Sequence, residues 1–261
     1  MDPLNAIAGF FVGILVGFTG VGGGAVMTPI LVFFFGVAPK TAIGTDLLFA
    51  AVTKAVGTAV HGSRGSVDWL VLRRLAMGSL PAAALTLAVL HFLPDEELTR
   101  AWLLPALAFA LIATSLAMLF QRALHRLGRK LRTTSPTRFK RAQPGLTVLA
   151  GALLGLLVTI TSVGAGALGA AMLVYLYPYR LTPQKLVGTD IAHAVPLTVV
   201  AGLGHWSLGN VDVSLLGTLL VGSIPGIILG SQLSIRVSGV YVRHAIAVML
   251  AVVGAKLLLG R

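Results

Sequence analysis

Two stretches decide how this chain folds: GILVGFTGVGGG at residues 13–24 and GLLVTITSVGAG at residues 155–166. Each is apolar and ends in closely spaced glycines that follow one or two hydroxyl residues. The repetition continues, because Gly-Thr-Asp stands at residues 44–46 and again at residues 188–190. Duplicated halves that each open with a glycine-interrupted apolar segment are typical of secondary transporters.

The composition indicates that the solvent of this chain is lipid. Of its 261 residues, 56% are hydrophobic and 11% are charged, whereas about 25% of the residues of a soluble domain are charged. In lipid the backbone must satisfy its own hydrogen bonds, which favours helices. We therefore predict an all-α integral membrane protein with two homologous four-segment halves, residues 1–121 and 145–261, joined by a basic cytoplasmic linker at 122–144. The chain has no cysteine, and we predict no cofactor, no metal centre and no catalytic residue.

The positive charge is concentrated in that linker. The formal net charge is +12, yet a basic stretch between two apolar blocks indicates the cytoplasmic side of a membrane rather than nucleic-acid binding. It also suggests contact with anionic lipid head groups. Eight basic residues lie there: Arg122, Arg126, Arg129, Lys130, Arg132, Arg138, Lys140 and Arg141.

Six apolar runs have the length of about 20 residues that a membrane-spanning helix needs. The opening segments of the two halves, residues 4–36 and 145–178, are longer and must be broken, tilted or folded back. If they are re-entrant hairpins, most basic residues of the second half fall inside, as the positive-inside rule requires, although Lys40 goes against it. Three crossings per half would then make the second half an inverted repeat of the first. The six ordinary runs are residues 41–60, 69–92, 100–121, 183–205, 213–235 and 240–260.

Glycines at a spacing of four residues mark one face of three segments. Small residues at that spacing allow helix backbones to approach closely in lipid. They predict that the opening helix of each half packs tightly against a neighbour. The series are Gly9, Gly13 and Gly17; Gly151 and Gly155; and Gly222, Gly226 and Gly230.

The glycine-rich breaks are the candidate binding site. A broken helix exposes N–H groups at the start of its second part, where the helix dipole favours an anion. A simple kink that needs glycine for steric reasons is the alternative, but two breaks facing each other would form one central site. The candidate ligands are Thr19, Gly22, Gly23, Gly24 and Thr45 from the first half, and Thr161, Ser162, Gly164, Gly166 and Thr189 from the second.

Asp46 and Asp190 are carboxylates inside apolar spans, where charge is costly. With His193, they are candidates for proton coupling, or they hold broken helix ends in place as hydrogen-bond acceptors. Lys54, a possible counter-charge for an anion, has Thr198 at the corresponding position. His61 and His205 are candidate gate residues. Each stands seven residues before an aspartate, Asp68 or Asp212, which we expect to cap the next helix.

Taken together, the Val-Gly-Gly-Gly break, the Gly-Thr-Asp helix, the His...Gly-x-Val-Asp turn and the basic linker resemble the TauE/SafE sulfite exporter family, also called the 4-toluene sulfonate uptake permeases. The resemblance covers both halves of the chain. It implies transport of sulfite or small organosulfonates across the bacterial inner membrane, coupled to protons, by a multi-pass protein. Neither the particular sulfur anion nor the oligomeric state follows from it.

Three other functions compete with this interpretation. A passive anion channel would use the same breaks, and a cation or metal carrier would use Asp46 and Asp190. An intramembrane aspartyl hydrolase would need the two aspartates to share a proton, but its Gly-x-Gly-Asp motif is missing here. We therefore predict a carrier and not an enzyme.

Overall fold

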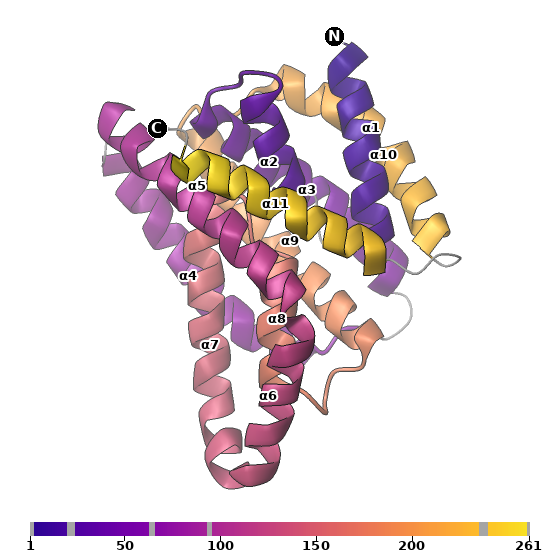
Figure 1. The fold of residues 1–261 in the computed structure, drawn as a ribbon. Coiled ribbons are helices and arrows are strands. Elements are labelled where there is room, and N and C mark those ends of the chain that lie inside the picture. The colour runs from indigo at the N-terminus through magenta and orange to yellow at the C-terminus, as the bar shows by residue number, and fades with distance from the viewer. Residues whose placement is uncertain (1–2, 20–23, 63–65, 93–95, 235–239, 260–261) are drawn as a thin grey trace.

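The computed structural model describes residues 3–19, 24–62, 66–92, 96–234 and 240–259 (Figure 1). These residues form helices and connecting turns, with no strand among them. The all-helical prediction is confirmed. In the described ranges there are eleven helices: α1 (Pro3–Thr19), α2 (Gly24–Phe33), α3 (Pro39–Gly62), α4 (Trp69–Phe92), α5 (Glu96–Leu119), α6 (Gln121–Thr134), α7 (Pro136–Thr161), α8 (Ala167–Leu176), α9 (Pro183–Ser207), α10 (Val213–Ser234) and α11 (Val240–Leu259).

Both opening segments break where the glycines predict. In the first half α1 ends at Thr19 and α2 begins at Gly24; in the second half α7 ends at Thr161 and α8 begins at Ala167. The helices of the two halves correspond in order, α1 to α5 with α7 to α11, and α6 is the additional helix of the linker.

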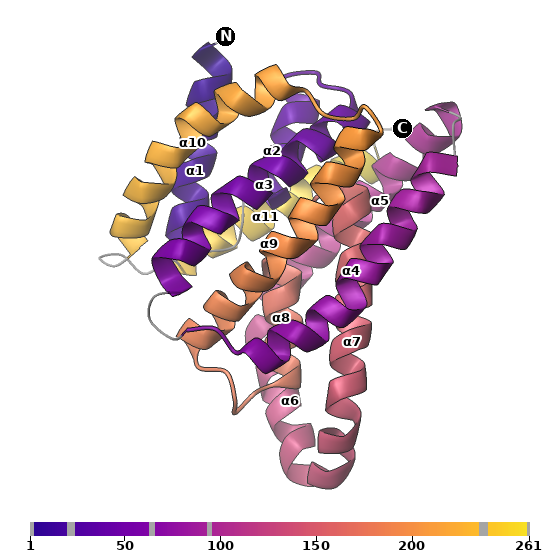
Figure 2. The same cartoon turned by 180° about the vertical axis from the view of Figure 1, so that it is seen from behind.

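The halves are interlocked through their opening helices. α1 packs along α10, and α7 packs along α4, so each opening helix lies against the opposite half (Figures 1 and 2). A Cβ added at Gly9 would lie 2.3 Å from the carbonyl oxygen of Leu219, and one added at Gly151 would lie 2.1 Å from that of Leu75. These two contacts occupy corresponding positions. The tight packing of both opening helices, predicted from the glycine spacing, is confirmed.

α3 and α9 form the centre of the molecule and run antiparallel (Figure 2). Gly44, near the start of α3, lies against His205 at the end of α9, while Gly202 lies against Leu48. α5 and α11 pack together on one side of this pair, where Ser115 donates a hydrogen bond of 2.7 Å to the carbonyl of Ala247. The two helices that carry the Gly-Thr-Asp motifs therefore pack against each other and against helices of both halves.

Six helices of the described chain are long and apolar enough to cross a membrane. Five of them, α4, α5, α9, α10 and α11, were expected from the sequence. The sixth is α7, in which an apolar stretch follows the polar residues 136–144. α3 has the length of a span but carries Lys40, Asp46 and Lys54 among its apolar residues, and it is not among the six. The chain is thus a multi-pass membrane protein in which one central helix is unusually polar.

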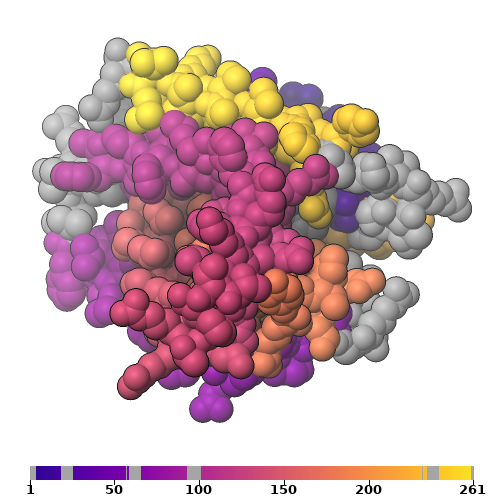
Figure 3. Space-filling model, turned by 60° about the horizontal axis from the view of Figure 1, so that its bottom comes forward, coloured from indigo at the N-terminus to yellow at the C-terminus, as the bar shows by residue number. Residues whose placement is uncertain are grey.

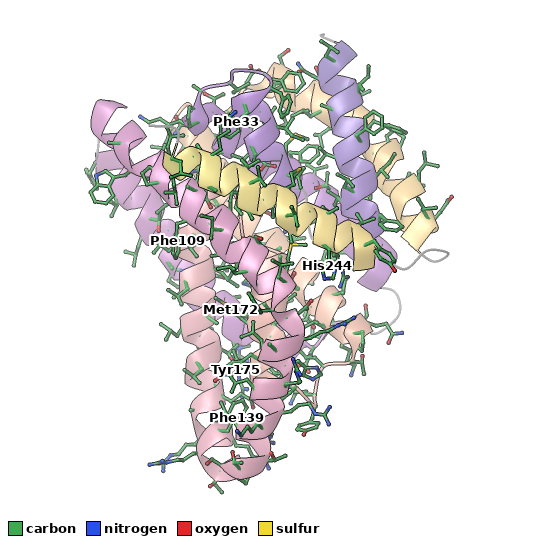
Figure 4. The ribbon with its side chains drawn as sticks, in the orientation of Figure 1. Phe33, Phe109, Phe139, Met172, Tyr175 and His244 are labelled. Atoms are coloured by element: carbon green, nitrogen blue, oxygen red, sulfur yellow. The ribbon has the colours of Figure 1, made fainter. Side chains whose placement is uncertain are left out.

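The basic linker is helical rather than a loop. α6 and the first residues of α7 form a hairpin that projects from the bundle (Figure 1) and stands in front when the molecule is seen from that end (Figure 3). It packs on α8, because Gly128 lies against the carbonyl of Tyr175 and the rings of Phe139 and Tyr175 meet edge to face at 6.2 Å (Figure 4). The hairpin thereby holds the far end of the helix that begins at the second break.

Candidate functional site

The break between α7 and α8 has a backbone that few residue types can adopt. Ser162 has φ 59°, Gly164 has φ 115° and Gly166 has φ 147°. Positive φ is costly for residues with a Cβ, so the two glycines follow directly from this geometry, and Ser162 is the exception.

The start of α8 presents unoccupied backbone donors. Its N-cap, Gly166, supplies no side-chain hydrogen bond. The first backbone bonds at this end run from the N–H groups of Gly169 and Ala170 to the carbonyls of Gly164 and Gly166. The N–H groups that precede them lack helical partners, and the helix dipole adds positive potential at the same place. This end of α8 is suited to an anion.

Thr161 supports the shape of the break. Its hydroxyl donates to the carbonyl of Leu157 at 2.6 Å and accepts a hydrogen bond from the N–H of Val163 at 3.1 Å. It thus joins the last turn of α7 to the strained segment that follows. The predicted ligand Thr161 therefore lies at the site, with its hydroxyl bonded to the backbone.

Lys54 reaches this break from the opposite half. It lies on α3, is 4% exposed, and its ammonium group donates a hydrogen bond to the carbonyl of Ala165. The positive charge of Lys54 interacts electrostatically with the carboxylates of both Asp46 and Asp190. Among the described residues, neither aspartate forms an ion pair with it within 4 Å. Lys54 thus places a positive charge beside the start of α8.

Asp46 lies near the same break. Its Oδ2 accepts a hydrogen bond of 2.5 Å from the hydroxyl of Thr28, a residue of α2. Within the described chain its Oδ1 has no hydrogen-bond partner, and neither has the hydroxyl of Ser162, although both atoms are buried. The Ser162 hydroxyl is close enough to act on the Asp46 carboxylate. The Ser162 hydroxyl and the Asp46 carboxylate therefore lie close together where the halves join.

Asp190 has different surroundings. Its Oδ1 packs against Gly169, where an added Cβ would lie 2.1 Å away. His193, one turn further along α9, has its Nε2 at 2.8 Å from the hydroxyl of Ser79 on α4. The two aspartates occupy corresponding positions in the sequence, but the structure gives them different partners.

Thr45 and Thr189 hold the turns of the opposite half. The hydroxyl of Thr45 accepts a hydrogen bond of 3.0 Å from the N–H of Asp212, and that of Thr189 accepts one of 2.8 Å from the N–H of Asp68. The neighbouring Gly44 and Gly188 allow the contact, since an added Cβ would meet the carbonyl oxygens of Asn210 at 2.1 Å and Ser66 at 2.4 Å. Each hydroxyl thus binds the backbone of the opposite half. We call these two contacts, Thr45 with Asp212 and Thr189 with Asp68, the junctions between the halves.

The remaining predicted residues are placed as follows. Asp68 and Asp212 accept hydrogen bonds from the N–H groups of Val71 and Leu215, so both cap the next helix as expected. His205 is buried, with its Nε2 at 2.9 Å from the carbonyl of Thr159 and its Nδ1 at 3.4 Å from the side chain of Asn210. Gly24 begins α2. Gly22, Gly23 and the side chains of Thr19 and His61 lie outside the described residues.

Sequence reasoning missed two residues of this site, Thr28 and Ser79. Each is a fully buried hydroxyl residue on an apolar helix. Their bonds join residues 18 and 114 positions apart. No spacing within one segment predicts such contacts, and the only signal was an isolated hydroxyl inside a span.

The family model described as sulfite exporter TauE/SafE matches residues 5–257. "Probable membrane transporter protein YjnA" of Bacillus subtilis (strain 168) is 38% identical over 258 residues, which cover 97% of this chain and 98% of that protein. "Probable membrane transporter protein MJ0441" of Methanocaldococcus jannaschii is 24% identical over 98% of this chain and 95% of its own length. No solved structure matches the chain.

Proposed function

The chain belongs to the sulfite exporter TauE/SafE family, and from this membership we propose that it moves sulfite or another small sulfur oxyanion or organosulfonate across the bacterial inner membrane. The observation that supports an anion is the uncapped start of α8 at Gly166, which lies beside the buried ammonium group of Lys54. Fixed donors and a positive charge in a low-dielectric interior attract an anion strongly.

The proposed binding site centres on the second break. The N–H groups after Gly164 and Gly166 would contact the oxyanion, Lys54 would balance its charge, and Thr161 would hold the break in shape. The corresponding residues of the first half, Thr19 and Gly22 to Gly24, are proposed to complete the site. Because Thr45 and Thr189 bind the opposite half, we propose for them a role in joining the halves.

Transport is proposed to follow alternating access. Each half contributes one break and one junction to the centre, so rocking of one half against the other would expose the anion to either side. The two halves are proposed to form an inverted repeat, and the sequence-based proposal couples transport to protons through Asp46 and Asp190. If so, Asp46→Asn or Asp190→Asn removes the dependence of flux on a pH gradient in liposomes; flux that keeps this dependence in both variants contradicts proton coupling.

Anion binding tests the proposal directly. Purified protein in detergent is titrated with sulfite, small sulfonates, chloride, phosphate and carboxylates, first by thermal shift and then by calorimetry. Selective, saturable binding of a sulfur oxyanion supports the proposal. Lys54→Met should weaken this binding about tenfold or more, because a buried charge partner is lost, and Thr161→Val should weaken it less.

The matched control is Lys185→Met, which removes an exposed lysine of α9. Its affinity should equal that of the unchanged protein. If no sulfur oxyanion binds, or if Lys54→Met binds as tightly as the control, the proposed site is wrong.

A further inference from the structure

The linker hairpin, residues 121–144, carries a basic surface without counter-charges. The sequence has no Asp or Glu between Glu97 and Asp190, so α6, α7 and α8 offer no carboxylate. Within the described chain no carboxylate from another element pairs with the hairpin. Four exposed basic side chains recur on α6 at the spacing that lines one helix face: Arg122, Arg126, Arg129 and Lys130.

The opposite face of α6 is bound to α8. Leu124 packs into the apolar cluster that α8 shares, and Gly128 lies against the carbonyl of Tyr175. α6 is therefore amphipathic, with one face buried and the charged face outside. The first turns of α7 repeat the pattern, because Phe139 is buried beside Tyr175. Three more basic side chains near Phe139 are exposed: Arg138, Lys140 and Arg141.

The basic surface begins where the apolar spans end. The span of α5 reaches Leu119, and the apolar stretch of α7 follows residue 144. At 1.5 Å per residue, Arg122 and Arg141 lie within about 6 Å of these ends along their helices. The head-group layer on each side of a bilayer is about 5–8 Å thick. This depth favours lipid head groups, rather than a soluble protein, as the partner of the surface.

The hairpin also holds the far end of α8 through side-chain contacts. The Nε2 of His125 lies 3.0 Å from the carbonyl oxygen of Pro178. Arg129, on the basic face, stands over the ring of Tyr179, with its guanidinium carbon 5.4 Å from the ring centroid. α8 has 10 residues and is about 15 Å long. A displacement of the hairpin is therefore carried to the start of α8 at the second break.

We propose that the hairpin is a docking surface for anionic lipid head groups and that docking positions α8 for anion binding. Head-group phosphates bind the guanidinium and ammonium groups of α6 and α7. The docked hairpin fixes the end of α8 and orders the second break, so that a sulfur oxyanion binds more tightly. The lipid surface stands on the hairpin alone, whereas its effect on the oxyanion rests on the proposed function.

Lipid binding is measured first, without any sulfur anion. Delipidated full-length protein in a neutral detergent is titrated with short-chain phosphatidylglycerol, short-chain phosphatidylcholine and glycerol 3-phosphate, and followed by thermal shift and calorimetry. Saturable binding of phosphatidylglycerol that weakens with added salt supports the surface. Equal binding of the two lipids overturns it. Binding of glycerol 3-phosphate as tight as that of the lipid identifies a site for soluble phosphates and overturns it as well.

Charge variants locate the surface. Arg126→Gln with Lys130→Gln removes two charges from the face opposite Gly128. Each charge near an anionic surface is worth about fivefold in affinity, so this double variant should bind phosphatidylglycerol about tenfold or more weakly. The matched control, Lys185→Gln with Lys256→Gln, removes two exposed lysines outside the hairpin and should bind unchanged. Equal affinity of the two double variants overturns the assignment.

Coupling to the anion is tested in nanodiscs. Sulfite is titrated in discs of phosphatidylcholine alone and of phosphatidylcholine with phosphatidylglycerol. An affinity that rises about threefold or more with the anionic lipid supports the coupling, because the negative surface potential by itself lowers the local concentration of an anion. A sulfite affinity that stays equal or falls overturns the coupling.

A second double variant separates docking from its effect. His125→Ala with Tyr179→Leu removes two contacts between α6 and the end of α8 and keeps every Arg and Lys of the hairpin. It should still bind phosphatidylglycerol, but its sulfite affinity should no longer rise with that lipid. A rise that persists in full overturns the coupling through α8. Failure of sulfite and sulfonates to bind in any lipid, with phosphatidylglycerol still bound, contradicts the proposed function and leaves the lipid surface supported.

Discussion

Thr45 and Thr189 show how one hydroxyl can join two halves of a protein. Each lies directly before a buried aspartate, and each accepts a hydrogen bond from the backbone of the opposite half. The partner N–H groups belong to Asp212 and Asp68, at the starts of α10 and α4, where helices have unpaired donors. The threonines satisfy these donors where no helical carbonyl can.

Thr45→Val and Thr189→Val should each lower the stability of the protein by about 1–3 kcal/mol, the cost of leaving a buried donor unpaired. The midpoint of thermal unfolding in detergent should fall for both. Their affinity for a sulfur oxyanion should change little, because these hydroxyls face the junctions. If anion affinity falls tenfold or more without a loss of stability, the two threonines contact the anion, as was predicted from the sequence.

Asp68 also forms an ion pair with Arg180, at 2.6 Å. The side-chain hydrogen bond from Arg180 holds the pKa of Asp68 below its usual range. The pair therefore stabilises the protein above the unfolded pKa of about 3.9, and this stability is lost as the pH falls through the lower pKa of the folded state. Because Arg180 is half exposed, solvent screening limits the contribution to about 1 kcal/mol or less.

Arg180→Gln should therefore unfold at a lower temperature than the unchanged protein at neutral pH. The difference should shrink as the pH is lowered below about 4, where the carboxylate of the unfolded state is protonated. Thermal unfolding at a series of pH values measures it. A difference that stays constant at acidic pH would mean that Arg180 acts through packing alone.

Among the helices, α10 provides a matched test of glycine packing. A Cβ added at Gly222 would lie 1.8 Å from the carbonyl oxygen of Ala6 on α1, whereas one added at Gly217 would meet nothing within 4 Å. Close backbone approach increases the van der Waals packing that drives helix association in lipid. The same approach recurs in the other half, where Gly78 meets Val148 on α7.

Gly222→Ala should destabilise the protein by about 1–3 kcal/mol, because a methyl group has no room between the backbones. Gly217→Ala should be neutral or stabilising by up to about 1 kcal/mol, since alanine is the better helix former. The readouts are the unfolding midpoint and the monodisperse fraction in detergent. Equal behaviour of the two variants would show that α1 and α10 are not packed through Gly222.

For the molecule as a whole, the alternating access that we propose would require two junctions between the interlocked halves to open in turn. One joins Thr45 to the start of α10, and the other joins Thr189 to the start of α4. The chain has no cysteine of its own, so introduced pairs can be cross-linked without side reactions. This makes the junctions accessible to a direct experiment.

The double variants Thr45→Cys with Asp212→Cys, and Thr189→Cys with Asp68→Cys, should form disulfides on oxidation. Each disulfide should stop flux into liposomes, and a reducing agent should restore it, because a locked junction prevents the halves from moving. Single-cysteine variants under the same oxidant are the controls. Full flux through a cross-linked protein would show that this junction stays closed during transport.

Much of the architecture could be predicted from residues close together in the chain. Apolar runs, glycines at a spacing of four and two glycine-rich breaks are local patterns, and they specify helices, close helix contacts and helix ends directly. The breaks after Thr19 and Thr161 and the helix caps at Asp68 and Asp212 were confirmed for this reason. The helical form of the basic linker was missed because its charges indicated only a location outside lipid.

The contacts at the centre depend instead on how the halves cross. Lys54 reaches Ala165 across 111 residues, and Thr45 reaches Asp212 across 167. Repeated motifs predict equal roles for Asp46 and Asp190, yet Thr28 and Ser162 surround only the first. Such contacts arise when helices from different halves pack side by side. They join residues that are far apart in the sequence, and no local sequence pattern marks such a pair.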